Sequence, residues 1–266
     1  MNENVDVPQI FEPDYYQRLY EIEEHHGWAQ GLRDAMDALL QPVMNGKRLR
    51  ALDIGCGTGY LLEYLQRYPL DGAVVGIDIS SHALQFCQQR GANDLAIASA
   101  TQVPFPTASF DLIICIDTIQ HLTPAGADLV AIKEFARLLR PGGLLYLRTN
   151  SALGHRPLEG ADPNQYRRYR LTELKKMIDQ ADMHALRATY LNAIPGFWAM
   201  LREYTQISHR KVRAIGPGLS IQLHPPEKAW LNRAIYRTLA FEAWMIGKAR
   251  FNLPFGHSTA VLARKG

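Results

Sequence analysis

Three glycines and a carboxylate, closely spaced near residue 55, could bind a ligand that has a positively charged end. The apolar run 49–54 contains Asp53 near its end, and Gly55, Gly57 and Gly59 follow directly. Such a run predicts a buried parallel strand. The glycines permit a tight turn and let a ligand touch bare backbone. Residues 60–68 predict a helix whose first N–H groups point back at that ligand.

A second carboxylate, Asp78, ends the next predicted strand, 73–78, and lies 19 residues after Gly59. Parallel strands place their carboxyl ends on one edge of the sheet, so Asp53 and Asp78 should lie at the same edge. In doubly wound sheets an acid at this position binds the ribose hydroxyls of an adenosine group. We expect Ile79 to pack on the adenine face.

The glycine spacing separates two classes of adenosine ligand. Dinucleotide-binding enzymes use G-x-G-x-x-G and donate N–H groups to a pyrophosphate, whereas this chain has G-x-G-x-G after Asp53. A carboxylate there would repel a pyrophosphate. The stretch resembles motif I of the class I S-adenosylmethionine (SAM) methyltransferases. The resemblance implies that SAM, with S-adenosylhomocysteine as its product, contacts Asp53, Gly55, Cys56, Gly57 and Gly59. A glycine-rich turn without a ligand is the alternative.

Two later segments resemble the same family. Ser99 and Ala100 stand where family members commonly place an acid followed by alanine near the adenine amino group, and serine supplies no charge there. After the apolar strand 109–116, the resemblance implies that Ile116 and Asp117 meet the methionine end of SAM. His121 stands where many members carry histidine.

Histidine could serve as a general base because its pKa lies near neutrality. His121 and His155 are the candidates, and Tyr16 could orient an acceptor. A structural role for His121, bracing its loop, is the alternative. No spacing typical of metal ligands occurs.

The N-terminal segment predicts a helix over 11–40, interrupted at 25–28. Many SAM methyltransferases cover the cofactor with such a segment, and some carry a tryptophan and an arginine in it. Tyr20, Trp28 and Arg33 are therefore expected at the cofactor. Packing of these aromatic residues on the core is the alternative.

The alternation of predicted strands and helices indicates an α/β protein. By resemblance, we expect a Rossmann-like three-layer sandwich with a seven-stranded, mostly parallel sheet in the order 3-2-1-4-5-7-6. Residues 1–45 would form the helical cover, 46–192 and 253–266 the SAM-binding core, and 193–252 a helical insertion before the last strand. The helix after the fourth strand should stop at Arg140-Pro-Gly-Gly143, and the fifth strand should begin at Leu144.

The composition is that of a globular protein of 266 residues, with 47% apolar residues and a net charge of +3. Cys56, Cys87 and Cys115 have neither zinc nor C-x-x-C spacing, which favours free thiols and a cytoplasmic location. The polar N-terminus is unlike a signal peptide, and no run of 18 apolar residues occurs.

Charge is concentrated in the insertion. Residues 201–250 contain nine basic and three acidic residues, a net charge of +6, while the other residues carry −3. Three alternatives remain open: a lid that forms the acceptor pocket, an interface with another subunit, or a peripheral membrane contact that presents a lipid-like acceptor. No pattern specific for nucleic acid occurs. The polar loop 149–170 either brings arginines to an acceptor or lies solvated at the surface.

The sequence therefore predicts a methyltransferase that moves a methyl group from SAM to an O, N or C atom of a small molecule by in-line displacement. A SAM-binding protein without methyl transfer is one alternative. An NAD-type oxidoreductase is another, against which the glycine spacing and Asp53 argue.

Overall fold

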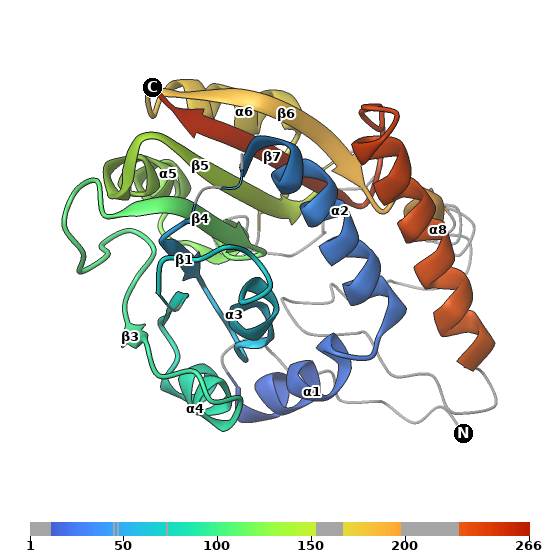
Figure 1. The fold of residues 1–266 in the computed structure, drawn as a ribbon, viewed down its shortest axis with the longest axis horizontal. Coiled ribbons are helices and arrows are strands. Elements are labelled where there is room, and N and C mark those ends of the chain that lie inside the picture. The colour runs from blue at the N-terminus through green and yellow to red at the C-terminus, as the bar shows by residue number, and fades with distance from the viewer. Residues whose placement is uncertain (1–11, 45, 47, 73, 153–166, 198–228) are drawn as a thin grey trace.

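The chain folds around a twisted seven-stranded sheet covered by helices on both faces, as the computed structural model shows (Figure 1). The structure describes residues 12–44, 46, 48–72, 74–152, 167–197 and 229–266. His155, the central part of the polar loop and most of the basic insertion lie outside these residues. Statements below concern the described residues.

The predicted strand order, β3-β2-β1-β4-β5-β7-β6, is confirmed. Five neighbouring strands are parallel, and β7 runs antiparallel to both β5 and β6. The strands are β1 (Ala51–Ile54), β2 (Val75–Asp78), β3 (Leu95–Ile97), β4 (Phe110–Ile116), β5 (Leu139–Asn150), β6 (Met183–Leu191) and β7 (Ser258–Lys265).

Side chains of the central strands point alternately to two cores, which explains why these strands are apolar on both faces. On β4, Leu112 and Ile114 join the core that is covered by α2, α3, α4 and α8. Ile113 and Cys115 join the core on the opposite face, beneath α5 and α6. The helices are α1 (Pro13–Glu23), α2 (Gly27–Met44), α3 (Tyr60–Leu65), α4 (Ser81–Gln89), α5 (Ala127–Leu138), α6 (Leu171–Asp179) and α8 (Ala229–Gly247), with the short helix η1 (Ile119–His121).

The fifth strand begins earlier than the sequence predicted. Leu139 already pairs with Phe110, and regular pairing then resumes between Leu144 and Leu112. Residues 140–143 therefore form an irregular extension of the strand, with Gly142 at φ +78° and Arg140 paired to Asp111. The helix does end directly before this segment, at Leu138, so the predicted stop is right and only the predicted start of the strand at Leu144 is wrong.

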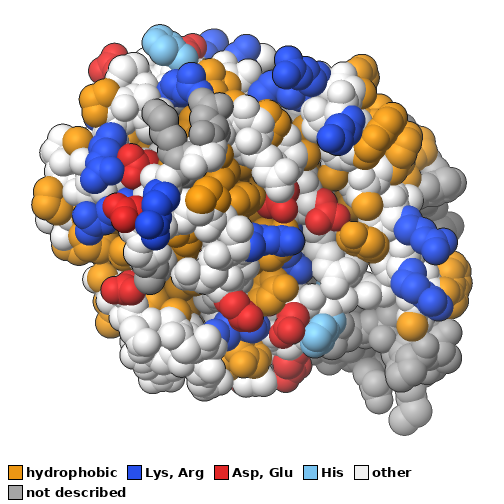
Figure 2. All heavy atoms as spheres, in the orientation of Figure 1, with side chains coloured by type: hydrophobic (Ala, Val, Ile, Leu, Met, Phe, Trp, Pro, Cys, Tyr) orange, Lys and Arg blue, Asp and Glu red, His pale blue; other side chains and the backbone are white. Residues whose placement is uncertain are grey.

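Helix α8 packs against α2 at close range. A Cβ atom on Gly27 or Gly31 would overlap Asn232 or Leu239 of α8, so the two glycines permit this approach. The outward face of α8 carries exposed Trp230 together with exposed Arg233 and Arg237. Figure 2 shows basic and hydrophobic side chains at its right-hand edge, where α8 lies. No described helix is long and apolar enough to cross a membrane.

Candidate cofactor site

The glycine loop connects β1 to α3 at the carboxyl edge of the sheet and has the left-handed backbone that its glycines permit. Gly55, Gly57 and Gly59 have φ values of +74°, +54° and +82°. At Gly55 a Cβ atom would overlap the Thr118 side chain, and at Gly59 it would press on Cys87. At Gly57 it would meet only Leu19 of α1, at 3.7 Å. Gly57 therefore presents the bare backbone that a ligand could approach.

Asp78 borders this loop, as predicted from the ends of parallel strands. Its Oδ2 accepts a hydrogen bond from the Gly57 N–H at 3.0 Å, and its Oδ1 accepts one from the Ser80 N–H at 2.9 Å. Burial raises the pKa of Asp78, and these backbone donors oppose the rise. The carboxylate is thereby held in a fixed orientation at the loop.

Asp53 is a buried carboxylate to which the described part of the chain supplies no partner. Its exposed fraction is 2%, and no described residue donates a hydrogen bond to its carboxylate. Burial, then Asp78, then Glu23, raise its pKa to about 8. Buried charges are ordinarily paired, so an unpaired carboxylate beside a bare backbone fits a ligand with a cationic group.

The loop after β4 adjoins the glycine loop. Asp117 has φ +53°, rare for a residue with a Cβ atom, and its carboxylate forms an ion pair with Arg148 at the end of β5. The Arg148 guanidinium lies 5.7 Å from the centre of the Trp28 ring. This chain of contacts joins α2 to the ends of β4 and β5. Ile116, which precedes Asp117, is half-buried.

His121 lies in η1, in the same loop. Burial lowers its pKa to about 4, and the nearby Asp117 only partly opposes this. Its Nε2 is 3.3 Å from the Gln120 side-chain amide, whose oxygen accepts hydrogen bonds from Thr149 and the Asn150 N–H. His121 is thus a neutral imidazole at physiological pH, and its neighbour braces the loop.

The tyrosines of the predicted cover lie near the cofactor loop but differ in their contacts. Tyr16 is buried beside Ser80, with which it forms a hydrogen bond, and burial raises its pKa to about 12. It therefore lies at Asp78, the predicted ribose end, although the sequence had also suggested a role at the acceptor. Tyr20 stacks against Phe86 of α4, with ring centres 5.1 Å apart.

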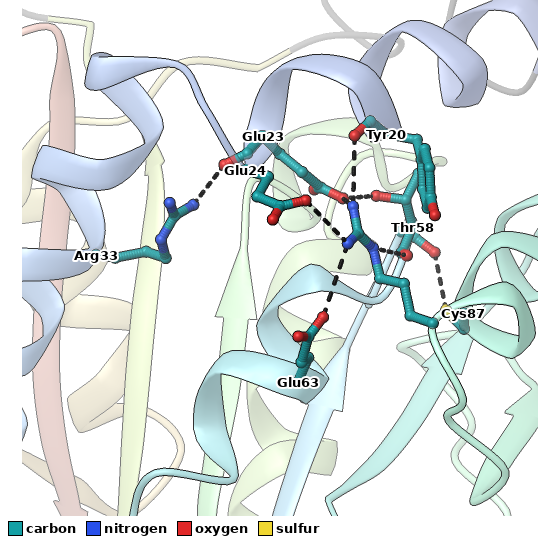
Figure 3. Close-up of polar contacts among 9 residues, drawn as sticks. Tyr20, Glu23, Glu24, Arg33, Thr58, Glu63 and Cys87 are labelled. Carbon is teal, nitrogen blue, oxygen red and sulfur yellow. Dashed lines mark hydrogen bonds and ion pairs between the residues drawn. The ribbon is translucent and has the colours of Figure 1, made fainter.

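Arg33 makes contacts within the helical layer. Its Nη1 donates to the Glu23 carbonyl at 2.7 Å (Figure 3). Its guanidinium lies 4.4 Å from the centre of the Tyr60 ring. It fastens the end of α1 to α2.

The residues that were predicted to contact the adenine differ in their solvent exposure. Ile79 is 60% exposed at the surface, while Ala100 is buried. The Ser99 hydroxyl lies 2.8 Å from the Thr101 hydroxyl and also accepts the Thr101 N–H. The Ser99 side chain therefore stabilises the turn in which it lies.

All three cysteines are free and buried, in agreement with the sequence. Cys56 and Cys87 lie with their Sγ atoms 3.8 Å apart beneath the glycine loop, and the Cys87 thiol donates to the Gly57 carbonyl at 3.2 Å. The Cys87 side chain of α4 thus contacts two residues of the glycine loop, Cys56 and Gly57.

Sequence reasoning missed three charged side chains near the site: Glu23, Arg90 and Arg148. Arg148 ends β5 at the ligand edge, so strand topology could have indicated it. No sequence signal connects Glu23 with Arg90, because 67 residues separate them and only the packing of α1 on α4 brings them together.

Known proteins share both the sequence of this region and its fold. Residues 52–147 match the family described as "Methyltransferase domain". The chain contains a methyltransferase domain. Its fold is that of the class I SAM-dependent methyltransferases, as the strand order also shows.

Among curated proteins, the fatty-acid O-methyltransferase of Mycolicibacterium smegmatis is 34% identical over 106 residues, which cover 39% of this chain and 37% of that protein. The matched part therefore spans little more than a third of that relative.

Solved structures match over nearly the whole chain. A SAM-dependent methyltransferase from Thermotoga maritima has a TM-score of 0.57 at 17% identity, covering 95% of this chain and 96% of that one. The [4+2]-cyclase SpnF has a TM-score of 0.57 at 19% identity, covering 97% of each chain. At these identities the likeness concerns the fold.

Proposed function

We propose that the protein transfers a methyl group from SAM to a small-molecule acceptor. The observation that carries this proposal is the pair of buried acids, Asp53 and Asp78, which lie close enough for Asp78 to raise the pKa of Asp53, with Asp78 bonded to the bare Gly57 backbone. Asp78 would accept hydrogen bonds from the ribose hydroxyls, and Asp53 would face the cationic part of the ligand. Ile79 would cover the adenine, with Ser99 and Ala100 beside it.

The acidic character of the loop also opposes the NAD alternative. Asp53, Asp78 and Glu23 are close enough for the two latter carboxylates to raise the pKa of the first. A pyrophosphate would add two further negative charges at this point. SAM, whose sulfonium and amino groups are positive, would instead offset them.

SAM supplies an electrophilic methyl group with a good leaving group already in place. The protein is left to align the acceptor in line with that methyl group and to exclude water. Trp28, Ile116, Asp117 and His121 would border this end of the cofactor. Because His121 has a pKa of about 4, it would be a weak base, suited to orienting an acceptor that is already ionised.

A carboxylate acceptor meets that condition, since it needs no base at neutral pH. The similarity to a fatty-acid O-methyltransferase supports testing fatty acids first among small-molecule acceptors. His155 stays a candidate for proton transfer from the sequence alone.

The experiment is titration calorimetry with S-adenosylhomocysteine. We expect Asp78→Asn to weaken binding about 10- to 100-fold, the effect of one lost hydrogen bond to a charged group. Asp94→Asn is the matched control, because Asp94 is exposed before β3, at the opposite edge of the sheet. Binding of NAD⁺ in place of S-adenosylhomocysteine, or equal affinities for Asp78→Asn and wild type, would contradict the proposal.

SAM binding without methyl transfer is the second candidate, and the similarity to a cyclase on the same fold supports keeping it. Incubation with methyl-labelled SAM and the acceptor panel separates the two: label in an acceptor supports methyl transfer, whereas product formation with intact SAM supports the second candidate.

A further inference from the structure

Helix α1 lies directly over the glycine loop. The Leu19 side chain is the neighbour of the bare Gly57 backbone, and Tyr16 bonds to Ser80 beside Asp78. A ligand that reaches the Gly57 backbone and the Asp78 carboxylate therefore has to pass α1. Whatever holds α1 in place also controls access to the site.

Apolar packing holds α1 less firmly than it holds α2. Helix α1 buries only Tyr16 and Ile22, and neither belongs to the two main cores, whereas α2 buries eight residues, most of them in one core. Burying one large apolar side chain stabilises by about 1.5–3 kcal/mol. Polar contacts therefore form a large share of the attachment of α1.

Arg90, which follows α4, makes two of these polar contacts and also reaches the glycine loop. Its side chain is 6% exposed. It donates to the Tyr20 carbonyl at 3.4 Å and to the Glu23 carboxylate at 3.3 Å, both on α1. It donates to the Thr58 carbonyl in the glycine loop at 3.2 Å (Figure 3). One guanidinium thus connects α1, α4 and the loop.

Two further carboxylates and two aromatic rings surround the same guanidinium. Glu24 and Glu63 each lie 3.7 Å from Nη1. The centres of the Tyr20 and Tyr60 rings lie 4.2 Å and 5.1 Å from its carbon Cζ. A planar, five-donor guanidinium can satisfy these partners together, and a lysine ammonium cannot.

The Glu23 carboxylate completes the connection, because it also accepts a hydrogen bond from the Thr58 hydroxyl. Burial raises the pKa of Glu23 to about 7, and Thr58, Arg90 and Arg33 oppose that rise. Without Arg90, a buried carboxylate on α1 would lose the cation that it is paired with, and Glu23 would be repelled by Asp53 at the end of β1.

We propose that Arg90 is a positioning residue that holds α1 over the glycine loop and so sets the rate at which the cofactor enters and leaves. This inference rests on the proposed function for the identity of the ligand. The attachment of α1 itself can be tested without any ligand.

The first test is hydrogen exchange of the full chain, comparing wild type, Arg90→Gln and Arg90→Lys. We expect the backbone amides of α1 after Pro13, at residues 14–23, to exchange at least about tenfold faster in Arg90→Gln than in wild type. Arg90→Lys should have an intermediate effect, and the amides of β4 should exchange at the same rate in all three proteins. Arg137→Gln is the matched control: Arg137 also bonds a glutamate, Glu134, and two backbone carbonyls, but far along the chain from α1. Equal acceleration in β4, or none in α1, would overturn the proposal.

The second test measures S-adenosylhomocysteine release by stopped-flow. Dissociation should be about tenfold faster in Arg90→Gln and unchanged in Arg137→Gln. If hydrogen exchange of α1 is faster in Arg90→Gln but S-adenosylhomocysteine dissociates at the wild-type rate, the proposal that α1 controls access to the site is overturned. If wild type fails to bind S-adenosylhomocysteine, the proposed function fails, while hydrogen exchange still decides whether Arg90 holds α1.

Discussion

Replacing Asp53 by asparagine should stabilise the ligand-free protein, and the gain should grow with pH. The Asp53 carboxylate is buried without a partner among the residues that the structure describes, and its pKa is raised to about 8. In the unfolded chain an aspartate has a pKa of about 3.9. Ionised Asp53 therefore opposes folding, a cost that is absent below pH about 4, grows with pH, and is complete above pH about 8.

The size of the effect follows from the pKa difference. Each unit of pH within this window changes the free energy of unfolding by about 1.4 kcal/mol. Between pH 5 and pH 8 the wild type should therefore lose about 4 kcal/mol relative to Asp53→Asn, because asparagine cannot ionise. Asp78 and Glu23 share the same electrostatic environment, so the loss belongs to the group of three acids.

Urea unfolding of both proteins at pH 5, 6, 7 and 8 measures this difference. Asp128→Asn is a matched control, because Asp128 is also 2% exposed but accepts hydrogen bonds from Arg167 and Tyr169. That variant should be destabilised, since it leaves an arginine without its carboxylate. A difference between wild type and Asp53→Asn that stays constant from pH 5 to pH 8 would refute the reasoning.

Two further predictions concern the loops around the site. His121 has a pKa of about 4, so, once an acceptor is found, kcat/KM should show no acid limb with a midpoint between pH 6 and 7; a limb there that disappears in His121→Asn would be contrary evidence. Gly55→Ala should destabilise more than Gly57→Ala in urea unfolding, because both require a left-handed backbone but only Gly55 lacks room beside Thr118. An equal loss of stability in the two variants would contradict this prediction and would mean that the left-handed backbone, rather than the contact with Thr118, determines the cost.

Much of the sheet edge followed from the sequence. Hydrophobic runs marked the strands, and Asp53, Asp78 and Asp117 each stand at or near the end of one, so parallel pairing was enough to bring them to one edge. Serine directly before a helix is a common N-cap, and the Ser80 Oγ indeed accepts the Ala83 N–H at the start of α4. These features depend on residues close together in the chain and on one topology.

The contacts within the helical layer could not be predicted from the sequence in the same way. Arg33 donates to the Glu23 carbonyl and lies over Tyr60, contacts that no sequence pattern indicated, while its place at the cofactor stays a prediction. On α8 the aromatic residues Trp230, Phe241 and Trp244 are exposed, while Leu239, Ala243 and Ile246 form the buried face. Periodicity shows that a helix has an apolar side, but which side is buried depends on the partner helix.

The sequence by itself determined the strands of the sheet edge, the glycine loop and the acids beside it, because local periodicity and the geometry of parallel strands fix those positions, while the strand order was expected from the family resemblance. Only the tertiary structure decided that Asp53 has no partner among the described residues, that His121 is a neutral imidazole, and that Arg90 connects α1 to the loop. Burial and charge pairing depend on residues far apart in the chain, and a pKa is set by everything that surrounds the group once the chain has folded.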